Sequence, residues 1–138
     1  MEEPLGYDDI QKKVNELSHQ VVGAAIEVHR HLGPGLLESA YEECVCRELH
    51  LRHIPYERQV PVQVEYKGIL LDCGYRIDIL AGGLIVIELK AVESLEPIHE
   101  AQLLTYLRLR KLWLGLLINF NVPILKSGVK RRVNGDPF

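Results

Sequence analysis

The chain of 138 residues has few cysteines, few aromatic residues and no long hydrophobic run. Its three cysteines, Cys44, Cys46 and Cys73, are odd in number and form no CxxC pair, which excludes a disulfide framework and a zinc finger. No stretch approaches the ~18 apolar residues of a membrane span. The acidic start, Met1–Pro4, lacks the basic and apolar regions of a signal peptide. We therefore expect a cytoplasmic protein with reduced cysteines.

The sequence also lacks a strong excess of one charge. There are 19 acidic residues against 16 Lys and Arg, a net charge of -3, which argues against a protein that is basic over its whole surface. Residues 105–138 nevertheless contain seven Lys and Arg and one acidic residue, a charge of +6. Residues 1–104 contain nine Lys and Arg and eighteen acidic residues, a charge of -9. The C-terminal quarter is either an ordinary solvated end or a surface that contacts phosphates.

Length and composition are those of one globular domain. Hydrophobic residues make up 47% and charged residues 25% of the chain, which excludes a disordered protein. A chain of this length can bury one core without disulfides or metals. We expect residues 1–138 to form a single domain with flexible ends at 1–7 and about 133–138.

The N-terminal third has the periodicity of helices. Apolar residues recur at steps of three and four from Asp8 to Leu32, which predicts one amphipathic helix that ends at Gly33-Pro34-Gly35. A second helix is predicted from about Leu36 to His53. Its inner face would be formed by Leu37, Tyr41, Cys44, Val45 and Leu49.

The middle of the chain reads as three strands. Val60, Val62 and Val64 alternate with polar residues and predict one strand; a second would run from about Ile69 to Leu80. The aliphatic run in Leu84–Lys90 is typical of a central strand buried on both faces. The short connections predict an antiparallel meander.

The C-terminal part returns to alternating elements. We predict a helix from about Pro97 to Lys111 and a strand from Trp113 to Phe120, parallel to the third strand because a helix connects them. One short edge strand could follow. The fold class is therefore α/β, with a mixed central sheet flanked by helices. The packing face of the last helix would be formed by Ile98, Ala101, Leu104, Tyr106 and Leu107.

Three charged residues do not fit a purely structural explanation. Glu88 and Lys90 end the most apolar strand and share one face of the sheet, and Asp78, at the end of the preceding strand, would lie opposite Glu88. Paired carboxylates suit a hard cation such as Mg²⁺, and a nearby lysine could orient an attacking water. The alternative is a structural Glu–Lys pair with Asp78 capping a turn.

Two helical pairs of polar residues are further candidates. Glu38 and Tyr41 are three residues apart, and Gln102 and Tyr106 are four apart, so that each pair shares a helix face. Without a function, Glu38 would be a first-turn glutamate that the helix dipole favours. Gln102 would then be a polar residue at the edge of a packed helix.

These motifs together resemble a known family. The GxxExxY proteins have the same residues in the same order: Gly35-x-x-Glu38-x-x-Tyr41, then Asp78, then Glu88-x-Lys90. That family is placed in the PD-(D/E)XK nuclease superfamily, whose fold is a restriction-endonuclease-like α/β/α core. The resemblance covers about residues 10–130. Gln102-x-x-x-Tyr106 is similar to the QxxxY motif of RecB-like and Cas4-like nucleases, whereas Ile77 replaces the proline before the aspartate.

The resemblance implies a role for each motif residue. Asp78, Glu88 and the backbone carbonyl of Leu89 would bind Mg²⁺ or Mn²⁺, and Lys90 would position the nucleophilic water. Glu38 would assist the metal or hold its water. The residues implied in substrate binding or in bracing the site are Gln102, Tyr106 and Tyr41.

The same resemblance implies a metal-dependent nuclease acting on nucleic acid, with DNA favoured over RNA. A homodimer is compatible with it. The cysteines do not match the ligands of Cas4-like clusters, so we expect no iron–sulfur cluster. Two alternatives stay open: an inactive nuclease-fold module that binds nucleic acid or a protein, and a small homodimer whose Glu88–Lys90 pair stabilises its sheet.

Overall fold

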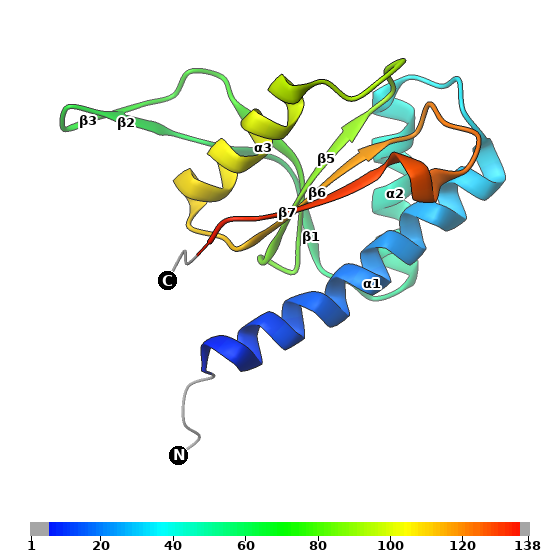
Figure 1. Cartoon of the computed structure of the whole chain (residues 1–138), viewed down its shortest axis with the longest axis horizontal. Helices are drawn as coiled ribbons and strands as arrows, with labels where there is room; N and C mark the ends of the chain where they lie inside the picture. Colours follow the sequence, from blue (N-terminus) through cyan, green and yellow to red (C-terminus); the bar gives the residue numbers. More distant parts are fainter. Residues whose placement is uncertain (1–5, 136–138) are drawn as a thin grey trace.

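A five-stranded mixed sheet forms the centre of the computed structural model, which describes residues 6–135 (Figure 1). The strands, in spatial order, are β1 (Tyr56–Pro61), β4 (Arg76–Ala81), β5 (Ile85–Lys90), β6 (Leu114–Asn119) and β7 (Val129–Val133). Only β5 and β6 are parallel; all other neighbours are antiparallel. The predicted parallel crossover and the short edge strand are both confirmed.

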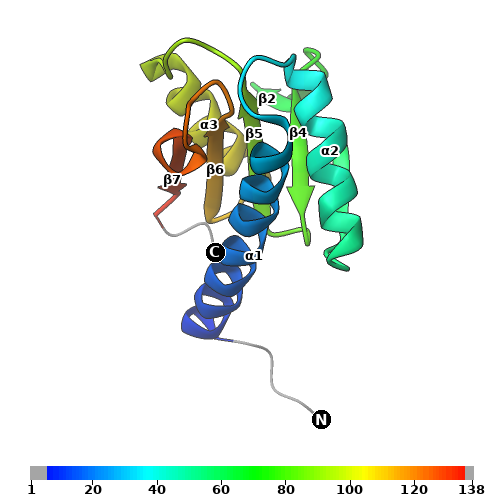
Figure 2. The same cartoon turned by 90° about the vertical axis from the view of Figure 1, so that its right-hand side faces the viewer.

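Helices cover both faces of this sheet (Figure 2). Helices α1 (Tyr7–Leu32) and α2 (Glu38–Leu51) pack on one face, and α3 (Pro97–Arg110) packs on the other. Residues of β5 alternate between the two cores, because Ile85 and Ile87 face α1 and α2 whereas Val86 faces α3. This α/β/α layering confirms the predicted fold class.

Local sequence explains where the helices begin and end. Helix α1 buries one apolar stripe and ends at Gly33, whose φ of 66° suits glycine. Helix α3 begins with Pro97 in its first turn and a capping box between Glu96 and His99. None of the helices in residues 6–135 combines the length and apolar composition that a bilayer crossing requires.

A two-stranded hairpin projects from the central sheet and corrects the predicted meander. Strands β2 (Val64–Tyr66) and β3 (Ile69–Leu71) pair only with each other, so each of the two strands predicted around them is interrupted. Lys67 and Gly68 have positive φ values of 49° and 83°, as a tight hairpin turn requires. The chain bends back to β4 at Gly74, whose N–H donates to the Asp72 side chain. We call residues 64–75 the arm.

Several predicted packing positions are exposed. Helix α2 begins two residues later than expected, which leaves Leu37 at its N-cap with 76% of its surface exposed. On α3, Ile98 and Ala101 face away from the sheet, and the buried residues are Leu103, Tyr106 and Leu107. The predicted flexible ends fall partly on residues 1–5 and 136–138, which lie outside the described residues; residue 7 begins α1 and residue 133 ends β7.

Candidate metal centre

Two acidic side chains lie opposite each other where β5 ends. Asp78 and Glu88 are one step beyond Ile79 and Ile87, the last residues paired between β4 and β5. The Leu89 N–H donates to Asp78 Oδ2 at 2.8 Å, and the Asp78 N–H donates to Glu88 Oε1 at 3.4 Å. Each carboxylate thus accepts a hydrogen bond from a backbone N–H of the opposite strand, as a backbone carbonyl does in the regular part of the sheet. Asp78 is the third residue of β4 and does not end it, contrary to the prediction from the sequence. Because β4 and β5 are antiparallel, a residue near the start of β4 lies opposite one near the end of β5.

Burial makes this carboxylate pair electrostatically unfavourable. Glu88 is 5% exposed, and burial, with a further contribution from the Asp78 charge, raises its pKa to about 9. Burial also raises the pKa of Asp78. The half-buried Lys90 acts in the opposite direction on both, since its positive charge lowers their pKa values. One ammonium group cannot balance two ionised carboxylates, so a second cation is needed for both to be charged.

The donor set at this position fits a divalent metal. Two carboxylates with the carbonyl of Leu89 provide hard oxygen ligands, and Mg²⁺ keeps several of its waters. No group of three or more His, Cys, Asp or Glu side chains suited to a metal occurs within residues 6–135, so the protein side chains alone would not complete a coordination sphere. Such a partly open site leaves positions for water and a phosphate oxygen.

Sequence reasoning missed Glu42 of α2, the acidic residue of that helix whose charge acts on Asp78. Its carboxylate is buried and accepts hydrogen bonds at 2.7 Å from Arg58 and from Gln59, both on β1. Its charge contributes to the raised pKa of Asp78. Glu38 is exposed in the first turn of α2. The missed signal was the four-residue spacing between Glu38 and Glu42, which places them on one helix face.

Tyr41 is engaged with the loop before its helix. The side chain is fully buried and stacks on Phe120, with ring centroids 4.3 Å apart. Its hydroxyl donates to the Gly33 carbonyl at 2.6 Å and accepts from the Leu36 N–H at 3.1 Å. These contacts favour a role in holding residues 33–37 over direct contact with a substrate.

Gln102 and Tyr106 lie on the α3 side of the sheet, which is also the side of the carboxylates. The Gln102 Nε2 donates to the Tyr106 hydroxyl at 3.0 Å. Burial, with contributions from the charges of Glu88 and Asp78, raises the pKa of Tyr106 to about 12. The structure therefore brings together Asp78, Glu88, Lys90 and this helical pair. Glu38 is not part of this group, because it lies exposed in the first turn of α2.

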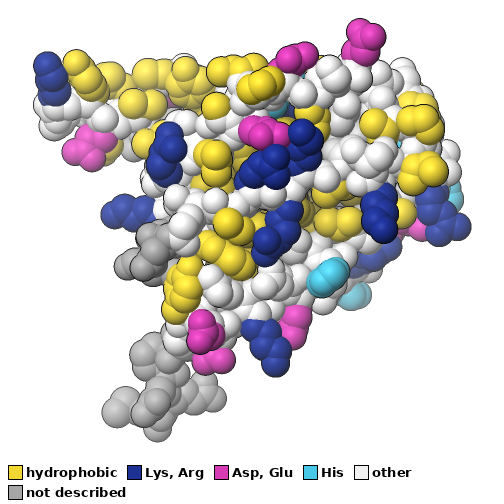
Figure 3. All heavy atoms as spheres, in the orientation of Figure 1, with side chains coloured by type: hydrophobic (Ala, Val, Ile, Leu, Met, Phe, Trp, Pro, Cys, Tyr) yellow, Lys and Arg dark blue, Asp and Glu magenta, His cyan; other side chains and the backbone are white. Residues whose placement is uncertain are grey.

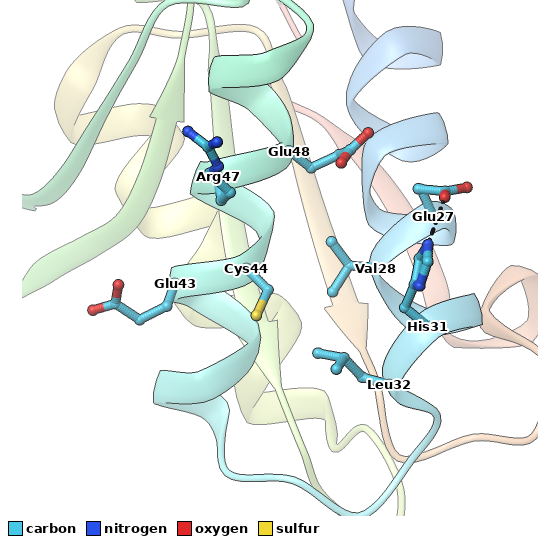
Figure 4. A pocket seen from close by; sticks show the side chains of 8 residues that line it. All are labelled: Glu27, Val28, His31, Leu32, Glu43, Cys44, Arg47 and Glu48. Atoms are coloured by element: carbon cyan, nitrogen blue, oxygen red, sulfur yellow. Dashed lines mark hydrogen bonds and ion pairs between the residues drawn. The ribbon is translucent and has the colours of Figure 1, made fainter.

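Cavities show which surface could receive a ligand. A groove between α1 and α2 is lined by three glutamates, Glu27, Glu43 and Glu48, and by none of the predicted site residues (Figure 4). A cavity of about 610 Å³ lies between the arm and α3, and Gln102 and Tyr106 line it. Figure 3 shows Lys and Arg side chains on the face formed by α3 and β7, and hydrophobic side chains along the arm.

The fold and this arrangement define a class of protein: an α/β/α domain with two opposed carboxylates, one buried and one half-buried, and a lysine on its central strands. Over residues 15–132 the chain matches the family model described as the PD-(D/E)XK nuclease superfamily. The chain belongs to this superfamily. Because this is a superfamily of nucleases, membership supports a nuclease-like function. PD-(D/E)XK nucleases generally use divalent metals. Among curated proteins and solved structures, none matches the chain.

Proposed function

We propose that the chain is a nuclease that hydrolyses phosphodiester bonds of nucleic acid, DNA in preference to RNA, with Mg²⁺ or Mn²⁺. The observation that carries this proposal is the opposed pair of the half-buried Asp78 and the buried Glu88 beside Lys90, with the pKa of Glu88 raised to about 9. A structural Glu–Lys pair would not need a second, half-buried carboxylate opposite Glu88. Superfamily membership over residues 15–132 supports the same conclusion.

Each residue of the centre has a distinct task in this proposal. Asp78, Glu88 and the Leu89 carbonyl hold the cation. A bound divalent ion neutralises charge on the scissile phosphate and lowers the pKa of water. Lys90 follows Glu88 on the same face of β5, where its ammonium donates a hydrogen bond to the attacking water and stabilises the charge that develops on the phosphate.

The outer residues orient the substrate and the ligands. Gln102 and Tyr106 form the wall of the centre on α3, where they contact the nucleic acid strand. Glu38 assists from the open end of α2, through water, and Tyr41 holds the loop that precedes it. These residues support placing the chain with the GxxExxY proteins and the QxxxY nucleases. We also propose that the enzyme acts in the cytoplasm.

Cleavage assays test the catalytic proposal. The purified chain is incubated with labelled single-stranded, duplex and branched DNA and RNA, with Mg²⁺, with Mn²⁺ or with EDTA. We expect metal-dependent cleavage by the wild type, loss of it in Lys90→Ala, and no change in Lys12→Ala, which removes an exposed lysine of α1. Equal trace activity of the wild type and Lys90→Ala on every substrate would reject catalysis at this site.

Metal titration by calorimetry separates an enzyme from an inactive module. The wild type should bind Mg²⁺ or Mn²⁺ with measurable heat, and Asp78→Asn should lose it because one of two carboxylate ligands becomes an amide. No heat with either protein, combined with nucleic acid binding in EDTA, would favour a binding module that retains the fold.

A further inference from the structure

The cavity between the arm and α3 is open, apolar and free of acidic groups. Tyr75 of the arm and Ile98 of α3 line it from opposite sides, and they are 45% and 69% exposed. Among the described residues that line it, none is an aspartate or a glutamate. In this respect it differs from the glutamate-lined groove between α1 and α2 (Figure 4).

This cavity and the candidate metal centre meet at the side chain of Tyr106. Tyr106 lines the cavity and belongs to the same buried cluster as Val86, which lies two residues before Glu88 on the same face of β5. Burial, and after it the charges of Glu88 and Asp78, raise the pKa of Tyr106, so its hydroxyl lies within reach of both carboxylates. A group held in the cavity therefore lies next to a phosphate at the metal centre. A nucleobase in the cavity and the phosphate of its own or the next nucleotide at the metal centre could occupy these two neighbouring places.

The lining has the chemistry that a nucleobase requires. The ring of Tyr75 meets the buried ring of Tyr106 edge to face, with centroids 6.3 Å apart, and its exposed part presents aromatic surface for stacking. The Gln102 amide donates to Tyr106, and its oxygen has no hydrogen-bond partner among residues 6–135. That oxygen can accept from a base edge, which carries donors and acceptors.

The charge beside the cavity suits the phosphates of the same strand. Arg108 donates to Thr105, which lines the cavity, and Arg110 and Lys111 follow in the last turn of α3 and at its C-cap. Residues 101–111 contain no acidic side chain. An apolar protein partner would gain nothing from this cationic rim, whereas a polyanion would.

We propose that this cavity binds an unpaired nucleobase next to the scissile phosphate, and that the substrate is therefore single-stranded nucleic acid or a single-stranded segment. The proposal rests on the proposed nuclease function and deepens it. A base within a duplex has both faces stacked and its pairing edge occupied, so it cannot enter a cavity between the arm and α3 unless it is unstacked.

Binding of fluorescent oligonucleotides tests this substrate class. Anisotropy is measured with a single strand and with the duplex of the same sequence, with Ca²⁺ in place of Mg²⁺ to prevent turnover. The wild type should bind the single strand more tightly. Tyr75→Leu should weaken this binding about 5- to 150-fold, the equivalent of about 1–3 kcal/mol for one stacked base, and Tyr75→Phe should bind like the wild type because it keeps the ring.

The chain offers a matched control for the opposite wall. Ile98 and Ile124 are 69% and 71% exposed, and only Ile98 lines the cavity. Ile98→Ala should weaken single-strand binding, whereas Ile124→Ala should leave it unchanged. Circular dichroism of each variant verifies folding, which substitution of such exposed side chains should preserve.

Three outcomes would overturn the proposal: tighter binding of the duplex, wild-type binding of the single strand by both Tyr75→Leu and Ile98→Ala, or a dimer in sedimentation that Ile98→Ala dissociates. Lys90-dependent cleavage combined with any of these would reject the base site and keep the nuclease. Single-strand binding that depends on Tyr75, without cleavage by the wild type, would keep the base site and reject the nuclease.

Discussion

Replacement of Glu88 by glutamine would show whether the buried carboxylates are arranged for a cation. Glu88→Gln keeps the size of the side chain and removes its charge, and the new amide can donate to Asp78. Burial and the Asp78 charge raise the pKa of Glu88 from the usual 4.5 to about 9. The metal-free folded protein therefore holds a proton on this group at pH 7, whereas the unfolded chain does not.

The direction and size of the effect follow from this difference. Because the folded state binds more protons than the unfolded state between pH 4.5 and about 9, the metal-free wild type loses stability as the pH rises through this window. Each pH unit contributes about 1.4 kcal/mol. At pH 7 the folded wild type is destabilised by about 3 kcal/mol, which Glu88→Gln should recover. Below pH 4.5 the difference should vanish, because the group is then protonated in both states.

Urea unfolding followed by the fluorescence of Trp113 measures this effect, in EDTA and in excess Mg²⁺. In EDTA at pH 7 the variant should be the more stable protein, and the gap should widen toward pH 9. At a Mg²⁺ concentration 100 times its Kd the wild type should gain about 2.7 kcal/mol, whereas the variant gains little. Glu93→Gln removes an exposed charge and should behave like the wild type. A variant no more stable than the wild type in EDTA would refute the electrostatic reasoning.

Three further predictions concern the residues that support the site, each measured by urea unfolding. Tyr41→Phe removes a hydroxyl that bonds two backbone groups of the preceding loop and should lower stability by about 1–2 kcal/mol; no loss would mean that the loop is held otherwise. Glu42→Ala removes a buried acceptor of two side-chain bonds and should cost about 2 kcal/mol, and wild-type stability would contradict its role as an anchor of β1. Gly128→Ala would press a methyl group against the Asn119 carbonyl oxygen and should destabilise by at least about 3 kcal/mol, whereas Gly135→Ala, with open space around it, should not; equal effects would argue against this close approach.

Hydrophobic patterning was sufficient to predict the central layers. The aliphatic run before Glu88 and the run in residues 113–120 could only be buried on both faces, and the helix between them made the two strands parallel. The opposition of Asp78 and Glu88 then followed from the short turn at residues 81–83. Because each of these inferences depends on local pattern and connection length, the sequence alone was enough.

The arm and Glu42 depended on information that the pattern does not contain. Residues 64–71 have the alternating or apolar pattern of a core strand. Most of them are nevertheless exposed, because β2 and β3 pair only with each other and project from the central sheet. Glu42 is buried because Arg58 and Gln59 of β1 reach it across the fold. A contact between residues 16 positions apart cannot be inferred from helical periodicity, which describes only the face on which Glu42 lies.

The basic C-terminal quarter divides into two sets of cations with different tasks. Lys130 and Arg132 of β7 both donate to Glu100 of α3 at 2.9 Å, and this carboxylate has its pKa lowered by those bonds. Their charges thus hold the edge strand against the helix. Arg108 and Arg110 lie at the other end of α3, where Arg110 lines a hollow together with Glu65 and Leu70 of the arm. The partner Glu100 lies outside residues 105–138, so that a charge count over that segment overstated the surface available to phosphates. We therefore expect phosphate contacts at the end of α3, where the chain has cations next to an apolar cavity, and not along β7.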